Sequence, residues 1–150
     1  MKLETAHFGV VEIDENSILH FDDGLPGLEA DQRYALLTNE QSKPVSWLQS
    51  VDHKEIALPV VDPFLPCPGY DFEISPGDVE RLEAGQAQDL FVLNVLVIPE
   101  DINGMTVNLS APIVVNARNK KGRQIILDGR QYRVRMPVSE LLGRSVKDGL

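Results

Sequence analysis

The chain has 150 residues, 43% of them hydrophobic and 25% charged, and its formal net charge is −9; we expect residues 1–150 to form a single domain. This acidic balance excludes the basic footprint that direct binding of DNA or RNA requires. The longest apolar run, residues 90–98, is about half a membrane span, and the N-terminus lacks the apolar core of a signal peptide, so we expect a cytoplasmic protein that has no membrane partner.

Five strands are predicted in the first part of the chain, because short runs of alternating apolar side chains are separated by polar or glycine-containing turns. Gly9 lies inside the first run and predicts a bulge or bend. Pro59 has no amide donor, so its strand is predicted at a sheet edge or next to a bulge. The predicted strands are residues 3–11, 17–21, 33–38, 45–51 and 56–61.

Prolines dominate the next segment, residues 62–69, and a regular strand ladder cannot form there. We predict an extended arm that lies over the sheet, followed by a strand at residues 70–74. Phe64, Leu65 and Tyr70 are then either core side chains or an exposed binding patch, and an aromatic ring held beside proline loses little entropy on binding.

A short helix is predicted after this arm. Ser75 is a typical N-cap, Pro76 suits the first helical position, and Gly85 is the expected C-terminal stop. The apolar run at residues 90–98 predicts a central strand, in which Asn94 is an unusual polar residue.

The segment 105–136 predicts four short antiparallel strands. Its third connection, Asp128-Gly129, is a strong signal for a two-residue hairpin turn. That turn would place Ile125 opposite Tyr132, with both side chains on the buried face.

Residues 113–115 are apolar on both faces, which is typical of an interior strand, and residues 138–142 predict a terminal helical turn. More than ten short strands with closely spaced turns favour an all-β, mainly antiparallel fold. We predict a small closed or nearly closed β-barrel-like domain with one or two short helices, because closure removes exposed strand edges.

The sequence contains no recognisable metal or cofactor motif. His7, His20 and His53 have no partner at ligand spacing, and Cys67 is the only cysteine. No phosphate-binding glycine loop or serine nucleophile motif is present. We therefore predict no cofactor, no metal and no catalytic residue.

Three carboxylates near predicted strand ends, Asp52, Asp62 and Asp71, leave an alternative open. Two of them converging in a barrel mouth would suit acid–base chemistry in a small β-barrel enzyme or ligand-binding domain. Turn capping is the simpler interpretation of each.

Polar residues on the predicted outward faces, such as Gln124, are either recognition residues or ordinary solvent-facing side chains. We assign partner binding to a set drawn from the proline-rich arm and from these faces: Asp62, Pro63, Phe64, Tyr70, Asn108 and Asn116.

Taken in order along nearly the whole chain, several stretches resemble the flagellar assembly factor FliW family. Two positions depart from the family pattern. The family usually has an aromatic residue at the position of Leu28, and a more apolar stretch at that of Pro66-Cys67-Pro68. The stretches that carry the resemblance are Phe8-Gly9, Val11–Ile13, Ile18–Gly27, Trp47–Val51, Val61–Phe64 with Tyr70, Asn94–Pro99, Met105–Asn116, and Gly122–Leu127 with Tyr132.

The resemblance implies a cytoplasmic β-barrel-like protein without enzymatic activity, monomeric when free, that binds newly made flagellin and the basic translational regulator CsrA. Flagellin would occupy the protein and release CsrA to repress flagellin translation, and export of flagellin would reverse this. A net charge of −9 suits a basic partner. A purely structural subunit with one stoichiometric partner is the remaining alternative.

Overall fold

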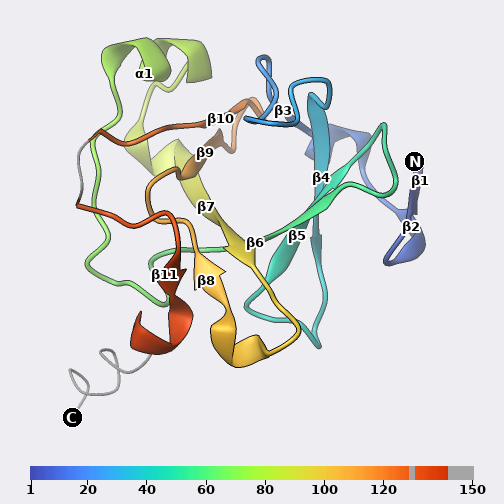
Figure 1. The fold of residues 1–150 in the computed structure, drawn as a ribbon. Helices are drawn as coiled ribbons and strands as arrows, with labels where there is room; N and C mark the ends of the chain where they lie inside the picture. The colour runs from blue at the N-terminus through green and yellow to red at the C-terminus, as the bar shows by residue number, and fades with distance from the viewer. Residues whose placement is uncertain (129–130, 142–150) are drawn as a thin grey trace.

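The computed structural model describes residues 1–128 and 131–141, and most of its strands form one antiparallel sheet (Figure 1). The all-β, mainly antiparallel prediction is confirmed. The helical elements are α1 (Pro76–Leu82) and the 3₁₀ turns η1 (Glu15–Ser17), η2 (Ala87–Asp89) and η3 (Ile102–Gly104). The strands are β1 (Lys2–Thr5), β2 (Gly9–Glu12), β3 (Leu19–His20), β4 (Arg33–Thr38), β5 (Ser46–Ser50), β6 (Ala57–Val61), β7 (Leu90–Val97), β8 (Thr106–Val107), β9 (Ile113–Asn116), β10 (Gly122–Gln124) and β11 (Met136–Pro137).

The main sheet has the order β10-β9-β7-β6-β5-β4-β3, and β8 pairs with both β7 and β11. The two ends of this path, β10 and β3, are not joined by a ladder, so the sheet is not closed. A single isolated bridge between His20 and Lys121 links the two ends, where the His20 amide donates to the Lys120 carbonyl at 2.8 Å. The sheet is therefore open, and this one bridge is the only pairing between its two ends among the described residues.

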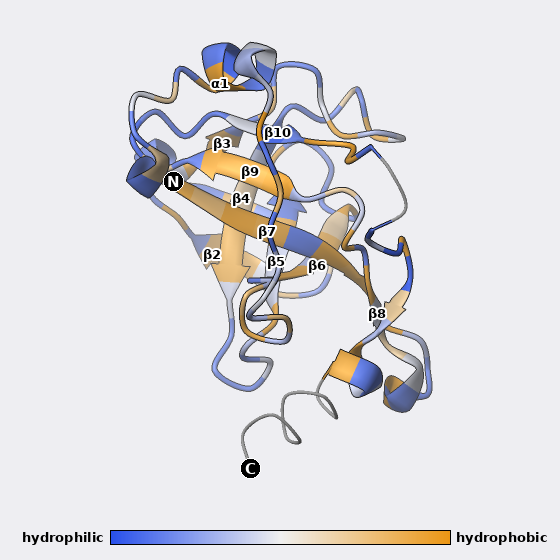
Figure 2. Cartoon of the chain, turned by 90° about the vertical axis from the view of Figure 1, so that its left-hand side faces the viewer, coloured by the Kyte–Doolittle hydropathy of each residue, from blue (hydrophilic) through white to orange (hydrophobic). Residues whose placement is uncertain are grey.

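Buried side chains form three apolar clusters, which lie against different parts of the sheet, and Figure 2 shows the hydrophobic colouring concentrated on strands such as β7 and β9. Strand β9 separates two of them: Ile113 and Val115 belong to the first cluster, and Val114 belongs to the third. The interior strand predicted from this doubly apolar run is confirmed. Leu28, one of the two departures from the family pattern, packs against the first cluster.

The first predicted strand is two strands that form a separate hairpin, so the prediction of one continuous strand was wrong. The chain reverses in the turn at residues 6–8, and Gly9, the first residue of β2, closes that turn with a φ of +67°. The Thr5 hydroxyl closes the turn, since it accepts from the Phe8 amide and donates to the Gly9 carbonyl, both at 2.8 Å. The Phe8 ring lies edge-on to Trp47 at 5.8 Å, which holds the hairpin against β5.

Strand β6 lies inside the sheet, between β5 and β7, although Pro59 predicts an edge or bulge. Pro59 is opposite Trp47 in the ladder with β5, whereas the ladder with β7 contains only Val60 and Val61. Pro59 therefore lies outside the β6–β7 ladder, and its missing amide interrupts no pairing there.

Helix α1 begins as predicted and ends earlier than predicted. The Ser75 hydroxyl accepts from the Asp78 amide, and Pro76 is the first helical residue. The left-handed residue at the C-terminus is Glu83, with a φ of +52°, rather than Gly85. Asn116 explains this end, since its side-chain amide donates to the carbonyls of Leu82 and Glu83 at 3.0 and 3.3 Å. The described helices are all too short to cross a membrane.

The hairpin predicted at Asp128-Gly129 does not fit the residues around it; Gly129 itself lies outside the described residues. Leu127 donates its amide to the Ser110 carbonyl, and the Arg133 carbonyl accepts from the Leu109 amide. The two predicted hairpin arms therefore bond to the segment before β9 rather than to each other. Tyr132 packs against Tyr70 at 4.7 Å, a partner from a distant segment that the local turn signal does not reveal. The helical turn predicted at residues 138–142 is present at residues 138–141.

Candidate partner-binding site

The segment after β6 is a compact series of turns, and the extended arm predicted for residues 62–69 was wrong. The Asp62 carboxylate accepts from the Phe64 amide at 2.9 Å, which confirms turn capping as the role of this side chain. The Cys67 amide donates to the Pro63 carbonyl, and the Tyr70 amide donates to the Cys67 carbonyl, both at 2.9 Å. Local turn bonds thus replace the ladder bonds that the prolines prevent.

These turns present two large apolar side chains to solvent. Phe64 is 43% exposed and Leu65 is 59% exposed, and Ile102, the first residue of η3, is also exposed. Beside Leu65 is an apolar hollow of about 260 Å³, whose lining includes Val45, Val61, Leu65, Pro66, Leu96 and Met105. An exposed apolar surface next to a hollow is typical of a protein-binding site.

Tyr70 anchors this loop to the sheet through a neutral hydrogen-bond network. Its hydroxyl donates to the Leu109 carbonyl at 2.7 Å and accepts from the Asn94 side-chain amide at 3.2 Å. Asn94 also donates to the Asn108 carbonyl at 2.7 Å, which accounts for the polar residue in β7. Burial raises the pKa of Tyr70 to about 12, so the hydroxyl stays protonated at physiological pH.

The structure brings five of the six predicted partner-binding residues into one region, and only two of the five are exposed. Asp62 and Phe64 face solvent, and Asn108 is partly buried. Tyr70 is 3% exposed, and Pro63 is buried beneath the loop.

Asn116 is the sixth residue, and its predicted outward position was wrong. It is 2% exposed and holds the end of α1. Sequence reasoning also missed Val45, Leu96 and Met105, which line the hollow. Their alternation identifies them as strand residues, but they meet only through long-range pairing.

A polar hollow of about 450 Å³ begins where this loop ends. Four carboxylates line it, from Asp71, Glu73, Asp78 and Asp128, and none of its described lining residues is lysine or arginine. Tyr132 also lines it and donates its hydroxyl to the Asp71 carbonyl at 2.9 Å. The same tyrosine contacts Tyr70, so the acidic hollow and the apolar loop share a boundary.

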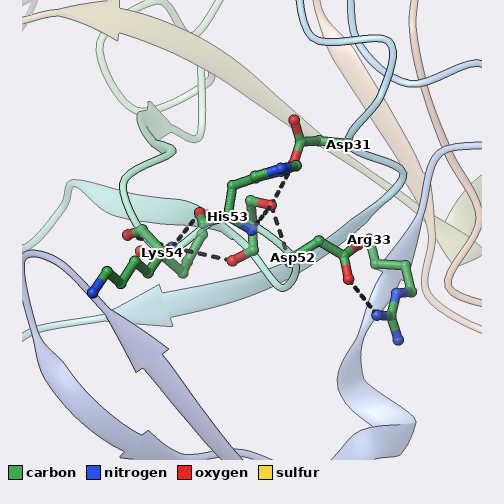
Figure 3. Close-up of polar contacts among 7 residues, drawn as sticks. Asp31, Arg33, Asp52, His53 and Lys54 are labelled. Carbon is green, nitrogen blue, oxygen red and sulfur yellow. Dashed lines mark hydrogen bonds and ion pairs between the residues drawn. The ribbon is translucent and has the colours of Figure 1, made fainter.

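The three carboxylates of the enzymatic alternative have separate local partners. Asp52 forms an ion pair with Arg33, and both side chains are largely exposed (Figure 3). Asp62 caps its own turn, and Asp71 lines the polar hollow. The geometry thus favours turn and surface roles over a converging acid–base pair.

A buried carboxylate that sequence reasoning missed lies near this ion pair. Asp31 accepts from the Ser50 hydroxyl and contacts Nδ1 of His53, both at 2.6 Å (Figure 3). In a catalytic triad the histidine lies between serine and carboxylate, whereas here the carboxylate lies between the other two. Ser50 is also fully buried, and its oxygen accepts from the amides of Asp52 and His53. The group therefore holds the β5–β6 turn.

Comparison with known proteins gives one consistent result. A family model described as FliW protein matches residues 2–138. The flagellar assembly factor FliW of Thermoanaerobacter pseudethanolicus is 37% identical over 143 residues, which cover 95% of this chain and 95% of that protein. Its counterpart in Alkaliphilus metalliredigens is 41% identical over 141 residues, covering 93% and 87%.

The fold gives the same answer as the sequence. A crystal structure of the flagellar assembly factor FliW matches this chain with a TM-score of 0.86 and 30% sequence identity. The match covers 92% of this chain and 96% of the crystallised chain.

Proposed function

Because this chain belongs to the FliW family of flagellar assembly factors, we propose that it binds flagellin and the translational regulator CsrA in alternation. In this proposal it is a cytoplasmic, single-domain protein, monomeric when free and without enzymatic activity. Flagellin occupies it before export, which frees CsrA to repress flagellin translation. When flagellin has been exported, the protein captures CsrA again.

The observation that carries this proposal is the apolar loop that shares a boundary with an acidic hollow. Phe64 and Leu65 project from a loop held by turn bonds and by Tyr70, so little conformational entropy is lost when a partner covers them. We assign flagellin to this apolar surface. Asp62 and Phe64 make contact, while Pro63, Tyr70 and Asn108 position the loop.

The acidic hollow suits the basic partner. Its carboxylates, of which Asp78 already pairs with Arg123 at 3.0 Å, and a net charge of −9 attract a positively charged RNA-binding protein and lower the positive potential around its RNA groove. Tyr70 and Tyr132 lie in contact between the two surfaces. A shift of the loop by one partner would therefore reach the surface used by the other, which is what alternation needs.

The test uses Phe64→Ala together with Val10→Ala, a truncation of another exposed apolar side chain, on the N-terminal hairpin. We expect Phe64→Ala to weaken flagellin binding at least about tenfold, as at a binding hot spot. Its free energy of unfolding should change by less than about 1 kcal/mol, because the ring is partly exposed. Val10→Ala should bind as the wild type does. Isothermal titration calorimetry measures the affinity and chemical denaturation measures the stability.

The alternation is tested by adding flagellin to the complex with CsrA. Release of CsrA in proportion to bound flagellin is expected. Two results contradict the proposal: failure of the wild-type chain to bind either protein, and a stable complex that holds both at their separate affinities.

A further inference from the structure

Strand β4 has an open edge along most of its length. Strand β3 pairs with it only at Tyr34 and Arg33, and the chain before β3 forms the 3₁₀ turn η1 instead of continuing the ladder. The other neighbour, β5, pairs with β4 from Tyr34 to Thr38. Residues 35–38 of β4 therefore have a strand on one side only.

The hydrogen-bond parity identifies which backbone groups face the open edge. The Arg33 carbonyl accepts from the Val51 amide on the β5 side, whereas the Gln32 carbonyl accepts from the Phe21 amide on the β3 side. The amide and carbonyl groups of successive residues in a strand point alternately to its two neighbouring strands. Leu36 and Thr38 therefore point their amide and carbonyl groups away from β5, toward the edge that β3 leaves uncovered.

A groove runs along this edge. Its volume is about 740 Å³, and its lining includes Leu36, Leu37 and Thr38 of β4 together with Phe8, Val11 and Ile13 from the N-terminal hairpin and the residue that follows it. The hairpin lies at the end of the molecule where β4 and β5 run, away from α1 (Figure 1). The groove thus offers unpaired backbone groups on one wall and apolar side chains on both.

The surroundings of the groove are acidic. Residues 8–17 and 36–41 contain Glu12, Asp14, Glu15 and Glu40 and no lysine or arginine. Glu12 and Glu40 line the groove with highly exposed side chains, so their ion pairs with the N-terminal amine and Lys43 contribute little and leave both carboxylates accessible to a partner. This charge disfavours a second copy of the chain, which carries −9 itself, and favours a cationic segment.

We propose that this edge accepts an extended, cationic segment of a partner protein, which adds to β4 as a new strand. Its backbone bonds to Leu36 and Thr38, its alternate apolar side chains enter the groove, and its lysine or arginine side chains reach Glu12 and Glu40. The inference goes beyond the partner switch, which uses the loop after β6, and it holds whether or not that switch operates.

The probe is a short acetylated and amidated peptide of alternating valine and lysine. When it binds, amide hydrogen exchange at Leu36 and Thr38, measured by NMR, should slow at least about tenfold. The amides of Ala35 and Leu37 bond to β5 already and should not change. The same peptide with alternate backbone amides methylated, so that it cannot pair with β4, should not protect Leu36 or Thr38.

The variant Thr38→Pro removes one donor from the open edge and leaves the bonds to β5 in place. It should weaken peptide binding about five- to tenfold, as expected for a lost hydrogen bond in a desolvated contact. Thr38→Ala keeps the donor and should stay within about twofold of the wild type. The double variant Glu12→Gln with Glu40→Gln should weaken binding and reduce its dependence on salt.

Three results overturn the proposal. One is equal binding of the methylated and unmethylated peptides, which would leave only non-specific charge attraction. Another is unchanged affinity in a folded Thr38→Pro variant; if that variant does not fold, the peptide comparison decides alone. The third is protection of Leu36 and Thr38 that grows with protein concentration in the absence of peptide, which would make a second copy the occupant.

Discussion

Two polar networks hold loops against different parts of the sheet, and they do so with different chemistry. The network around Tyr70 is neutral and buried, and joins the loop after β6 to β7 and to Leu109. The network around Asp31 is charged, and joins the β5–β6 turn to the segment before β4 through a His53 side chain that is 48% exposed. Both loops are fixed, but only the second is held by groups that titrate near neutral pH.

The two networks differ in the free energy of desolvation and in their response to pH. A neutral network avoids the desolvation of a charge and keeps the same strength at every physiological pH. In the other network burial alone would raise the pKa of Asp31, but hydrogen bonds from Ser50 and His53 outweigh burial and lower it. The hydrogen bond to Asp31 raises the pKa of His53. The loop after β6 is thus insulated from pH, whereas the β5–β6 turn is not.

The largest effect is expected from Tyr70→Ala. The ring belongs to the second core cluster and contacts the rings of Phe64, Phe72 and Tyr132. Its loss should lower the free energy of unfolding by about 3–5 kcal/mol, as for other buried aromatic residues. Tyr70→Phe keeps the ring and should cost only about 1 kcal/mol, the net value of a hydrogen bond. Urea unfolding of both variants gives the comparison, and equal losses would show that the hydroxyl rather than the ring holds the loop.

A smaller loss is expected from Asn94→Leu. The change removes the donor that serves both the Tyr70 hydroxyl and the Asn108 carbonyl, which should cost about 2 kcal/mol. The Asn94 side-chain oxygen has no partner among the described residues, so no acceptor interaction is lost with it. The loss should be the same at pH 5 and pH 8, because none of these groups titrates between about 5 and 8. A loss that varied with pH would contradict a neutral network.

The smallest effect is the pH dependence contributed by Asp31 and His53. Since the pKa of His53 is raised above 6.5, its contribution is complete below that pH and is lost as the pH rises through the raised pKa. Since the pKa of Asp31 is lowered below 3.8, its contribution is present above that pH and is lost as the pH falls through the lowered pKa. Stability due to the pair is therefore greatest between these two limits.

Asp31→Asn should flatten this profile, while Glu55→Gln, a change of one carboxylate in the adjoining turn, should largely keep it. Thermal unfolding measured from pH 4 to about pH 8 for wild type and both variants checks this. If wild type and Asp31→Asn show parallel profiles, the pair contributes nothing to the pH response.

Local signals in the sequence predicted much of the fold. Strand β4 has the predicted bounds, and α1 begins at the predicted cap, because alternation and the Ser75-Pro76 pair act within a few residues. The predicted pairing across Asp128-Gly129, which depends on where distant residues lie, was wrong. Around Asp128-Gly129, Leu127 and Arg133 bond to residues 109–110, and Tyr132 contacts Tyr70, which lies far away in the chain.

The candidate site, like the fold, was predictable only where local sequence signals decide the structure. The sequence left open whether these aromatic residues are core side chains or an exposed patch. Phe64 is exposed on the proline-rich loop, whereas Tyr70 is buried in the core. Asn116 and Asp31 show the limit of sequence reasoning. An asparagine at a strand end and an aspartate in a loop are both typical surface residues, and only the carbonyls of α1 and the Ser50 hydroxyl make burial favourable for them.

The contact between Phe8 and Trp47 gives the chain a built-in optical reporter. Trp47 is the only tryptophan, and its ring lies 5.8 Å from that of Phe8 on the N-terminal hairpin. Intrinsic fluorescence will therefore follow the undocking of this hairpin, while circular dichroism follows the whole sheet. Emission that changes at lower denaturant concentration than the dichroism signal would mean that the hairpin detaches first and bares one wall of the β4 groove while the rest of the sheet is intact.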